Sequence, residues 1–441
     1  MRDYLTILGA GLAGSEAAWQ AAERGVSVVL YEMRPVKPTP AHKTDHCAEL
    51  VCSNSLGNNQ SPSAPYLLKE ELRKFNSLVI DAGDTHAVPA GAALAVDREL
   101  FSKKITEQLL KHPNITLMRE EVTEIPSEGP VIVATGPLTS PRLSESISRL
   151  IGQEYLYFYD AISPIVDANT INYDKTFFAS RYDKGTDDYL NCPLNEGQYY
   201  SLVNELKNGE KVPFKSFEKP IYFEGCMPVE ELAMRGDKTL AFGPLKPVGL
   251  LHPETKEQFY AVVQLRHENK EGTAFNLVGF QTKLTYPEQK RVIRLIPGLE
   301  NAEFFRFGAI HRNTYINAPD VLSCELDLKK NSGIYFAGQI IGVEGYVESV
   351  SMGLLAALSA VKRIKGEVYS TPPVDTALGS LLKYVTETRR QSFQPMNINY
   401  GLFQVQEMKI RNKRERNKKI ELKALDSLSQ WMETINGELV K

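Results

Sequence analysis

The amino-acid sequence predicts an α/β fold built on a parallel sheet, with an α+β domain inserted into it. Two segments favour the parallel sheet: a strand–turn–helix–strand pattern in the first 32 residues, and a strand, a Gly-rich turn and a long small-residue helix in 332–364. The stretch 138–225 differs from both, because it is aromatic and rich in Asp and Asn. We interpret this stretch as the insertion, since it interrupts the two halves of the sheet.

The first segment has the layout of a dinucleotide-binding unit. An apolar strand, "DYLTILG", precedes a helix, "LAGSEAAWQAAERG", and a β-branched strand, "SVVLYE". The turn between strand and helix has the pattern GxGxxG, formed by Gly9, Ala10, Gly11, Leu12, Ala13 and Gly14. Glycine is needed there for the turn, for the approach of a pyrophosphate and for helix–strand packing. Glu32 ends the second strand, where a carboxylate can accept hydrogen bonds from ribose hydroxyls.

Two later segments favour FAD over NAD as the bound dinucleotide. The strand "GPVIVATG" (129–136) ends in Ala-Thr-Gly, a stretch that recurs in flavoproteins of this fold. The 332–364 segment has Gly338 in its Gly-rich turn, and its helix N-terminus suits the flavin end of the cofactor. The sequence has no second strand with its own GxGxxG turn. We therefore predict a Rossmann-like FAD-binding fold of the glutathione-reductase-like type, in which NAD(P)H comes to the flavin directly.

These assignments divide the chain into two domains. We expect a discontinuous FAD-binding domain at 1–137 and 226–441 and an inserted domain at 138–225. A basic helical segment at 405–441 belongs to the first domain and contains "KIRNKRERNKKIELK", with eight Lys or Arg against two Glu. Phosphate neutralisation needs such clusters, so Lys413, Arg414, Lys418 and Lys419 are candidate RNA contacts. The alternative is a solvated helix face.

Composition and cysteine spacing indicate a cytoplasmic protein. The net charge of −3 says little about partners, and the longest apolar run, 349–361, is too short to span a bilayer. Five cysteines without regular spacing argue against a disulfide framework. His42, His46, Cys47 and Cys52 lie within eleven residues but lack the Cys-x-x-Cys pairs of structural zinc sites, so we expect no metal.

Two cysteines have settings that suit chemistry. Cys52 opens onto a polar, helix-breaking stretch, and Cys226 lies in a turn between Gly225 and Pro228. Both are candidates for a catalytic thiol or a redox-active dithiol, whereas the other three cysteines lack such framing. In "HRNTYINAP", His311 belongs to a short polar stretch that is either a capped loop or a ligand contact.

Many long blocks follow one another in an order typical of one enzyme family. They include "LGAGLAGSEAAW", "TPAHKTDHCAELVCSNSLG", "CMPVEELA", "VGFQTKLTYPEQKR", "HRNTYINAP" and "GVEGYVES". From residue 5 to about 405 the chain resembles the folate- and FAD-dependent tRNA (uracil-5-)-methyltransferases. A related family that modifies the wobble uridine of tRNA shares "AGQIIGVEGY" but not "ELVCSNSLG".

The resemblance implies an activity and a set of residue roles. A one-carbon unit would pass from 5,10-methylenetetrahydrofolate, through FAD and with reduction by NAD(P)H, to C5 of the T-loop uridine of tRNA. Cys226 would add to C6 of the uracil, Cys52 would be a second thiol near the flavin, and His311 would stack on the pterin. The two cysteine roles could be exchanged. The GxGxxG residues and Glu32 would hold the adenosine and pyrophosphate of FAD.

Two other functions stay open at the level of the sequence. One is a flavin-dependent dithiol oxidoreductase that uses Cys52 and Cys226. The other is a flavin-stabilised tRNA-binding protein without enzymatic activity, in which both cysteines are passive. Formation of 5-methyluridine in T-loop RNA separates the enzyme from both.

Overall fold

The structure is a computed structural model of the chain. It describes residues 4–39, 41–152, 156–183, 187–213, 222, 227–388, 393–403 and 410–437, without the side chains of 156–160, 183, 311 and 312. Cys226 therefore lies outside the described residues. None of the helices in these ranges is long and apolar enough to cross a membrane.

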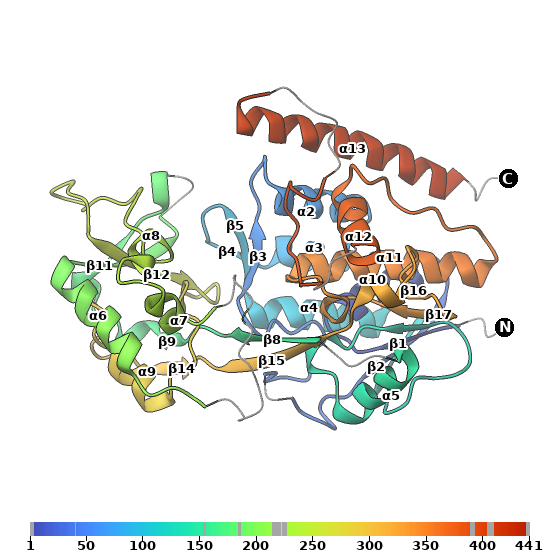
Figure 1. Cartoon of the computed structure of the whole chain (residues 1–441), viewed down its shortest axis with the longest axis horizontal. Coiled ribbons are helices and arrows are strands. Elements are labelled where there is room, and N and C mark those ends of the chain that lie inside the picture. The colour runs from blue at the N-terminus through green and yellow to red at the C-terminus, as the bar shows by residue number, and fades with distance from the viewer. Residues whose placement is uncertain are drawn as a thin grey trace.

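A six-stranded sheet forms the centre of the first lobe (Figure 1, right). Its strands, in spatial order, are β16 (Asp327–Leu328), β17 (Asn331–Phe336), β7 (Val131–Val133), β1 (Tyr4–Leu8), β2 (Ser27–Glu32) and β6 (Ile115–Arg119). All neighbours are parallel except β16 and β17. Strands β1 and β7 are almost wholly buried, as expected for a parallel sheet covered on both faces. The predicted parallel sheet is confirmed.

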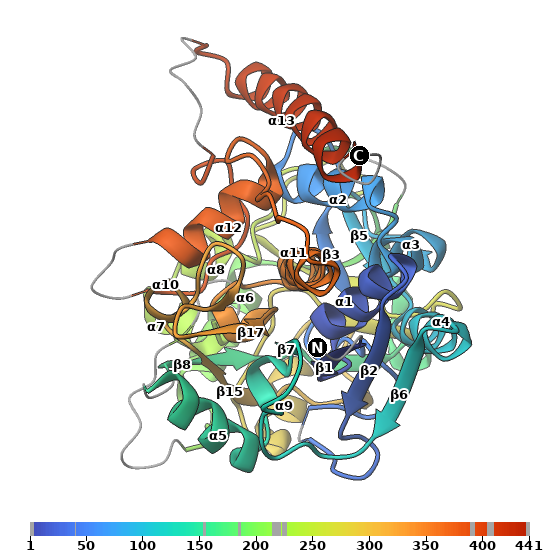
Figure 2. The same cartoon turned by 90° about the vertical axis from the view of Figure 1, so that its right-hand side faces the viewer.

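Helices α1 (Leu12–Glu23) and α11 (Tyr346–Lys365) pack side by side against this sheet (Figure 2). Gly353 permits their close crossing, because a Cβ there would lie 2.2 Å from the Ala13 carbonyl oxygen. The two helices come from the N-terminal and the 332–364 segments. Both segments therefore meet in one half of the molecule, as the sequence predicts. The other helices of this lobe are α2 (Ala64–Lys74), α3 (Leu78–Thr85), α4 (Arg98–Lys111), α5 (Pro141–Ile151), α10 (Ala318–Val321), α12 (Ala377–Glu387) and α13 (Lys413–Gly437).

A second, wholly antiparallel sheet builds the other lobe (Figure 1, left). Its order is β10 (Phe177–Phe178), β11 (Tyr189–Leu194), β12 (Ala261–His267), β13 (Ala274–Leu277), β9 (Ile165–Asp167) and β14 (Phe304–Arg306). Helices α6 (Glu196–Asn208), α7 (Val229–Met234), α8 (Thr239–Phe242) and α9 (Tyr286–Ile293) accompany it, around a core that includes Tyr199, Phe275 and Phe280.

The extent of this lobe differs from the insertion expected at 138–225. Strands β9, β10 and β11 fall inside that range, whereas β12, β13 and β14 follow it. Strand pairing is the physical reason, because the backbone of β11 is satisfied by β12 over six residue pairs. Residues 229–302 share the buried core of the second lobe rather than that of the first. We propose that the insertion runs from about 162 to about 309.

Two long strands join the lobes. β8 (Leu156–Ala161) leads into the second lobe and β15 (Ile310–Tyr315) leads back, and they pair antiparallel between the lobes (Figure 1). A small sheet of β3 (Ser55–Asn58), β5 (Ala93–Val96) and β4 (Ala87–Val88) lies in the first lobe, facing the second. The loop that carries Cys52 directly precedes β3.

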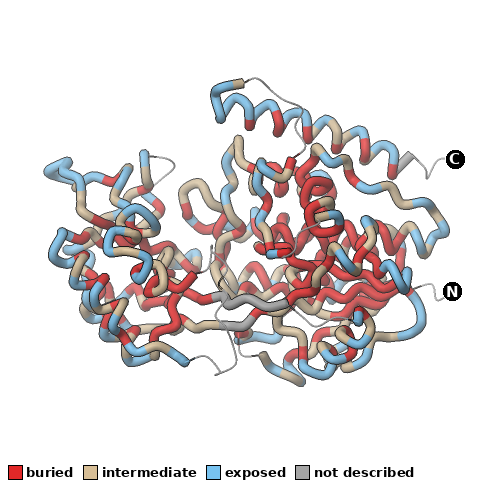
Figure 3. Tube along the Cα trace, in the orientation of Figure 1, coloured by how far each residue is buried: buried red, intermediate tan, exposed pale blue. Residues whose placement is uncertain are grey.

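Helix α13 crosses the outside of the first lobe (Figure 1). Its buried positions recur along one face, at Ile420, Ala424, Leu428, Trp431 and Ile435 (Figure 3). The Trp431 ring lies 5.7 Å from the Phe75 ring next to α2. The opposite face of α13 is open to solvent. The described part of the basic segment expected at 405–441 is therefore a helix that packs on the first lobe through its apolar stripe.

Candidate functional site

The three glycines of the GxGxxG turn have different environments. Gly9 has φ +96°, and a Cβ there would lie 2.8 Å from the Ala134 carbonyl oxygen. A Cβ on Gly14 would lie 1.8 Å from the Gly9 carbonyl oxygen. A Cβ on Gly11 would meet nothing within 4 Å, although Gly11 caps the N-terminus of α1. Gly9 and Gly14 are thus required by the fold itself, while Gly11 leaves space for a ligand beside the free N–H groups of the helix.

Glu32 binds the backbone of this turn from the end of β2. Its carboxylate accepts hydrogen bonds from the Ala10 backbone N–H at 3.1 Å and from the Arg34 backbone N–H and Nε at 3.0 and 2.9 Å. Burial opposes ionisation of Glu32, but the bonds from Arg34 outweigh it and hold its pKa below the ordinary value. A carboxylate has about four acceptor positions, so the three bonds leave one for a ribose hydroxyl.

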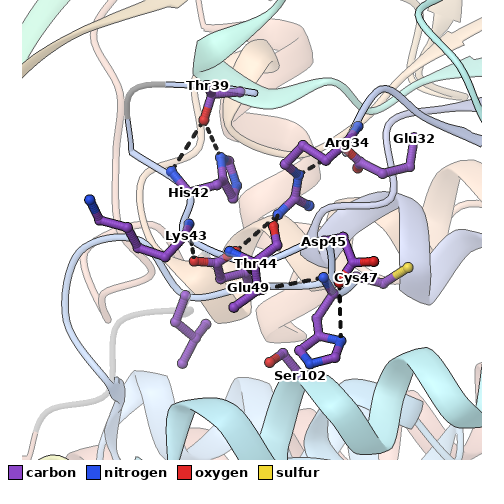
Figure 4. A network of polar contacts seen from close by, with 12 residues as sticks. Glu32, Arg34, Thr39, His42, Lys43, Thr44, Asp45, Cys47, Glu49 and Ser102 are labelled. Carbon is purple, nitrogen blue, oxygen red and sulfur yellow. Dashed lines mark hydrogen bonds and ion pairs between the residues drawn. The ribbon is translucent and has the colours of Figure 1, made fainter. Parts of the chain in front are cut away.

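Arg34 extends this arrangement into a polar network (Figure 4). Its Nη1 donates to Glu49 Oε2 and to the Thr44 carbonyl oxygen, both at 3.0 Å. His42 lies beside it, with Nδ1 2.5 Å from Thr39 Oγ1. Burial and the neighbouring Arg34 charge lower the pKa of His42 to about 4. The network therefore contains a neutral imidazole at physiological pH.

One cleft connects these groups. Its lining includes most of the residues that the sequence analysis assigns to the cofactor: Gly9, Gly11, Leu12, Ala13, Glu32 and Gly338. Ala10 and Gly14 are buried and do not line the cleft. Gly338 has φ +82°, and a Cβ there would lie 2.8 Å from the Ala13 Cβ in the first turn of α1. At the far end the cleft reaches Val51 and Tyr346, the first residue of α11. It thus runs from one helix N-terminus to the other.

Cys52 stands at this far end. Its backbone N–H donates to Tyr346 Oη at 2.8 Å, and its carbonyl oxygen accepts from Arg98 Nη2 at 2.7 Å. The thiol faces the Ala161 carbonyl oxygen at 4.0 Å, where β8 ends. Contacts with three distant segments therefore hold the Cys52 peptide next to the cleft.

Three arginines that sequence reasoning missed surround the Cys52 loop. Arg98 pairs with Glu268 at 2.6 Å, and Arg266 donates to the side chains of Ser53 and Asn54 at 2.8 and 3.0 Å. Arg306 donates from Nη2 to the Val51 carbonyl oxygen at 2.6 Å. They come from α4, β12 and β14, so both lobes contribute to the setting of the thiol. No local pattern marks them, because each is a single residue far from Cys52 in the sequence.

Comparison with known proteins places the chain in a family. The profile of the family described as Glucose inhibited division protein A matches residues 4–368. The Methylenetetrahydrofolate–tRNA-(uracil-5-)-methyltransferase TrmFO of Natranaerobius thermophilus is 57% identical over 97% of this chain and 99% of its own length. The TrmFO of Bacillus subtilis is 53% identical over 98% of this chain and 99% of its own length. The chain belongs to the TrmFO family.

Solved structures of a related protein share the fold. Aquifex aeolicus GidA superposes with a TM-score of 0.72 at 18% identity, over 98% of this chain and 76% of that chain. At this identity the likeness concerns the fold alone. It confirms the predicted class, a parallel α/β sheet with an added antiparallel sheet.

Among the remaining candidate residues, the backbone of His311 lies near the Cys52 thiol, and the other cysteines have different environments. The backbone of His311 pairs with that of Asp160 in the β8–β15 ladder. The residue after Asp160 is Ala161, whose carbonyl oxygen faces the Cys52 thiol. The side chain of His311 and all of Cys226 lie outside the part of the chain that the structure describes. Cys47 is buried, which raises the pKa of its thiol to about 11. Cys192 is buried and Cys324 is exposed.

The four candidate RNA contacts all lie on the first turns of α13. Lys413, Arg414 and Lys419 are exposed and form no ion pair with the described part of the chain. Lys418 is engaged, since its Nζ lies 2.6 Å from Glu421 Oε1 and 3.0 Å from Ser61 Oγ. The four lysine and arginine charges are therefore not equivalent.

Proposed function

We propose that this chain transfers a one-carbon unit from 5,10-methylenetetrahydrofolate to C5 of the T-loop uridine of tRNA, with FAD as cofactor and NAD(P)H as reductant. Membership of the TrmFO family supports this activity, because the relatives match nearly the whole chain at 53–57% identity. The observation in the structure that carries the proposal is the placement of Cys52. Its N–H is bound to Tyr346, which lines the dinucleotide cleft.

The cleft suits FAD on the chemistry of its lining. The N-terminus of α1, with open space at Gly11, can take the pyrophosphate, and Glu32 retains an acceptor for the ribose. When bound, the flavin supplies the redox centre between NAD(P)H, the folate carbon and the base. The chain itself binds and orients these partners, and the Cys52 loop closes the end of the cleft at Tyr346.

A cysteine thiolate makes the uracil reactive in this proposal. Uracil C5 is a poor nucleophile until a thiolate adds to C6 and turns the ring into an enolate. We assign this addition to Cys226 and the second thiol to Cys52, near the folate carbon. C5 then takes the one-carbon unit and loses its proton to a base, and the bond from the methylene to its carrier breaks. The exocyclic methylene takes a hydride, whose electrons come from NAD(P)H, and becomes the methyl group as the thiolate leaves C6. His311 is proposed to stack on the pterin.

Labelled substrates test the activity. Purified protein is incubated with unmodified tRNA transcript, NADPH and methylenetetrahydrofolate carrying a labelled one-carbon carbon, and the nucleosides are then separated. We expect labelled 5-methyluridine from folate and none from labelled S-adenosylmethionine. NADPH oxidation without any 5-methyluridine would instead indicate the dithiol oxidoreductase.

The cysteine roles are separable with RNA that carries 5-fluorouracil at the target. Fluorine at C5 cannot leave as a proton does. Once the thiolate has added to C6 and C5 has taken the one-carbon unit, the covalent adduct therefore resists denaturation and reports the nucleophile. We expect Cys226→Ala to lose this adduct while it keeps FAD. Cys52→Ala should form the adduct when a one-carbon unit is already loaded, but should not turn over. The reverse result would exchange the two roles.

A further inference from the structure

Arg306 differs from the other two arginines around Cys52 in what it binds. Arg98 donates to two backbone carbonyl oxygens and forms an ion pair with Glu268. Arg266 donates to the side chains of Ser53 and Asn54. Arg306 makes one hydrogen bond, to the Val51 carbonyl oxygen, and no ion pair with any described residue. Most of its guanidinium N–H groups are therefore without a partner in the described part of the chain.

The surroundings of Arg306 have an excess of positive charge. Three guanidinium groups share one carboxylate, that of Glu268, which is only 5% exposed. Burial lowers the pKa of Arg306, and the neighbouring Arg98 charge lowers it further. A half-buried guanidinium whose only described counter-ion is a carboxylate shared with two other arginines is costly unless an anion arrives. The site is thus arranged for a negative charge that the described part of the chain does not provide.

The position of Arg306 places this charge beside the loop that carries Cys52, the second thiol of the proposed reaction. Val51, whose carbonyl oxygen it holds, precedes Cys52 and lines the cleft. Arg306 also interacts electrostatically with Cys52 and Tyr346. It reaches this place from β14, at the edge of the second sheet, just before the chain returns through β15. An anion bound there would lie between the lobes, beside the thiol loop.

We propose that Arg306 binds the oxygen at C4 of the target uracil and stabilises the negative charge that forms there when a cysteine thiolate adds to C6. This proposal rests on the function proposed above. In the addition, the S–C6 bond forms and the C5=C6 π pair moves through C4, so that O4 becomes an enolate oxygen; no electrons enter or leave. The pair returns when C5 attacks the one-carbon unit. The C5 proton then leaves to a base, and the bond between the methylene and its carrier breaks. A hydride, whose electrons come from NAD(P)H, adds to the exocyclic methylene, and the S–C6 bond breaks with release of the thiolate.

The size of the effect follows from comparable sites. Removal of one donor from an oxyanion site lowers kcat by about 10²- to 10³-fold. Arginine suits an enolate oxygen because its fork can donate two hydrogen bonds, whereas a lysine is a single point charge. The charge develops only after addition, so substrate binding should change less than the rate.

The test measures addition directly in the FAD-loaded full chain. Arg306→Gln is compared with wild type for FAD content, tRNA affinity, kcat, and the rate of adduct formation with 5-fluorouracil RNA. We expect unchanged FAD, tRNA Kd within about threefold, and an adduct rate lowered by the same factor of about 10²–10³ as kcat. Arg294→Gln is the matched control, since Arg294 also holds a backbone carbonyl in the second lobe but lies away from Cys52.

Three outcomes overturn the assignment. A normal adduct rate in Arg306→Gln would mean that Arg306 does not act on the enolate. A raised KM for methylenetetrahydrofolate with unchanged kcat would make it a folate contact. If Arg306→Gln does not fold, Arg306→Lys is measured in its place. An adduct rate at least about tenfold below wild type, with full FAD content, supports the proposal. A rate closer to that of wild type contradicts the proposal. Failure of wild type to form the adduct or 5-methyluridine would instead reject the proposed function.

Discussion

At the residue scale, Gly11 and Gly14 show how one motif serves two purposes. Gly14 is needed because the Gly9 carbonyl oxygen occupies the place of its Cβ, at 1.8 Å. Gly11 has open space in that direction, so the protein alone does not require glycine there. What requires it, in our proposal, is the pyrophosphate of FAD. The same sequence pattern therefore combines a folding constraint with a binding constraint.

Gly11→Val separates these two constraints. We expect a folded protein whose flavin content is strongly reduced, because the side chain takes the ligand's space. Gly14→Ala should instead fail to fold, since the backbone of the turn must move. Flavin absorbance per protein and a thermal melt measure both effects. Full flavin occupancy in a soluble Gly11→Val protein would show that the pyrophosphate lies elsewhere.

His42 makes the part of the cleft near Glu32 and Arg34 sensitive to acid. Its pKa of about 4 in the folded chain lies below the ordinary 6.5. A base with a lowered pKa contributes stability above its unfolded pKa, and this contribution is lost as the pH falls through the folded value. Between pH 6.5 and 4, the melting temperature of wild type should therefore fall more steeply than that of His42→Gln. Parallel curves for the two proteins would contradict this assignment.

At the element scale, α13 combines an apolar stripe that anchors it with a basic end that faces solvent. Ser427 Oγ and Lys423 Nζ both contact Asp375, and Trp431 Nε1 donates to the Ser370 carbonyl oxygen, so the helix is held along its length. The exposed charges at its start are then fixed in position relative to the lobe. A fixed basic edge suits a rigid polyanion such as folded RNA.

Replacement of Lys413, Arg414 and Lys419 by Gln tests this edge. Each lost phosphate contact should reduce the slope of log K against log salt by about 0.7–0.9, while FAD content stays unchanged. Lys418→Gln is the matched control: its ammonium is engaged by Glu421 and Ser61, so we expect a smaller change. An unaltered slope in the triple variant would make α13 a solvated face.

The predictability of the site differs between elements for a physical reason. Gly9, Gly11, Gly14 and Glu32 belong to one contiguous strand–helix–strand unit, so local sequence predicts their placement. The arginines around Cys52 are brought together only by the folding of both lobes. Three of their partners are backbone oxygens, which leave no mark in a sequence, and the side-chain partner Glu268 is far from Arg98 along the chain.

At the scale of the whole molecule, two lobes meet at the Cys52 loop. The ion pair of Arg98 and Glu268 bridges them, with side chains 17% and 5% exposed, and the paired strands β8 and β15 carry the chain from one lobe to the other and back. The parallel sheet was predictable because both of its sequence segments carry strong local patterns. The end of the insertion could not be predicted in the same way, because β12, β13 and β14 pair with strands that lie much earlier in the chain.

The bridging ion pair should contribute measurably to stability. Glu268→Ala leaves the Arg98 charge without its partner, and loss of one member of a buried pair costs about 3–5 kcal/mol. We expect a value near the lower end, because Arg98 is not fully buried. Arg149→Ala removes a pair with Glu124 in which both side chains are 68% exposed, and it should leave the free energy of unfolding almost unchanged. Equal losses in urea unfolding would mean that the bridge is not a stabilising contact.

The most direct test of the account is transfer of the labelled one-carbon unit by a protein without the Cys52 thiol. Cys52→Ala is compared with wild type and with Cys324→Ala, which removes an exposed cysteine away from the cleft. All three proteins receive labelled methylenetetrahydrofolate, NADPH and unmodified tRNA after their FAD content has been matched. We predict labelled 5-methyluridine from wild type and Cys324→Ala and none from Cys52→Ala. Labelled 5-methyluridine from Cys52→Ala at the wild-type rate would contradict the account.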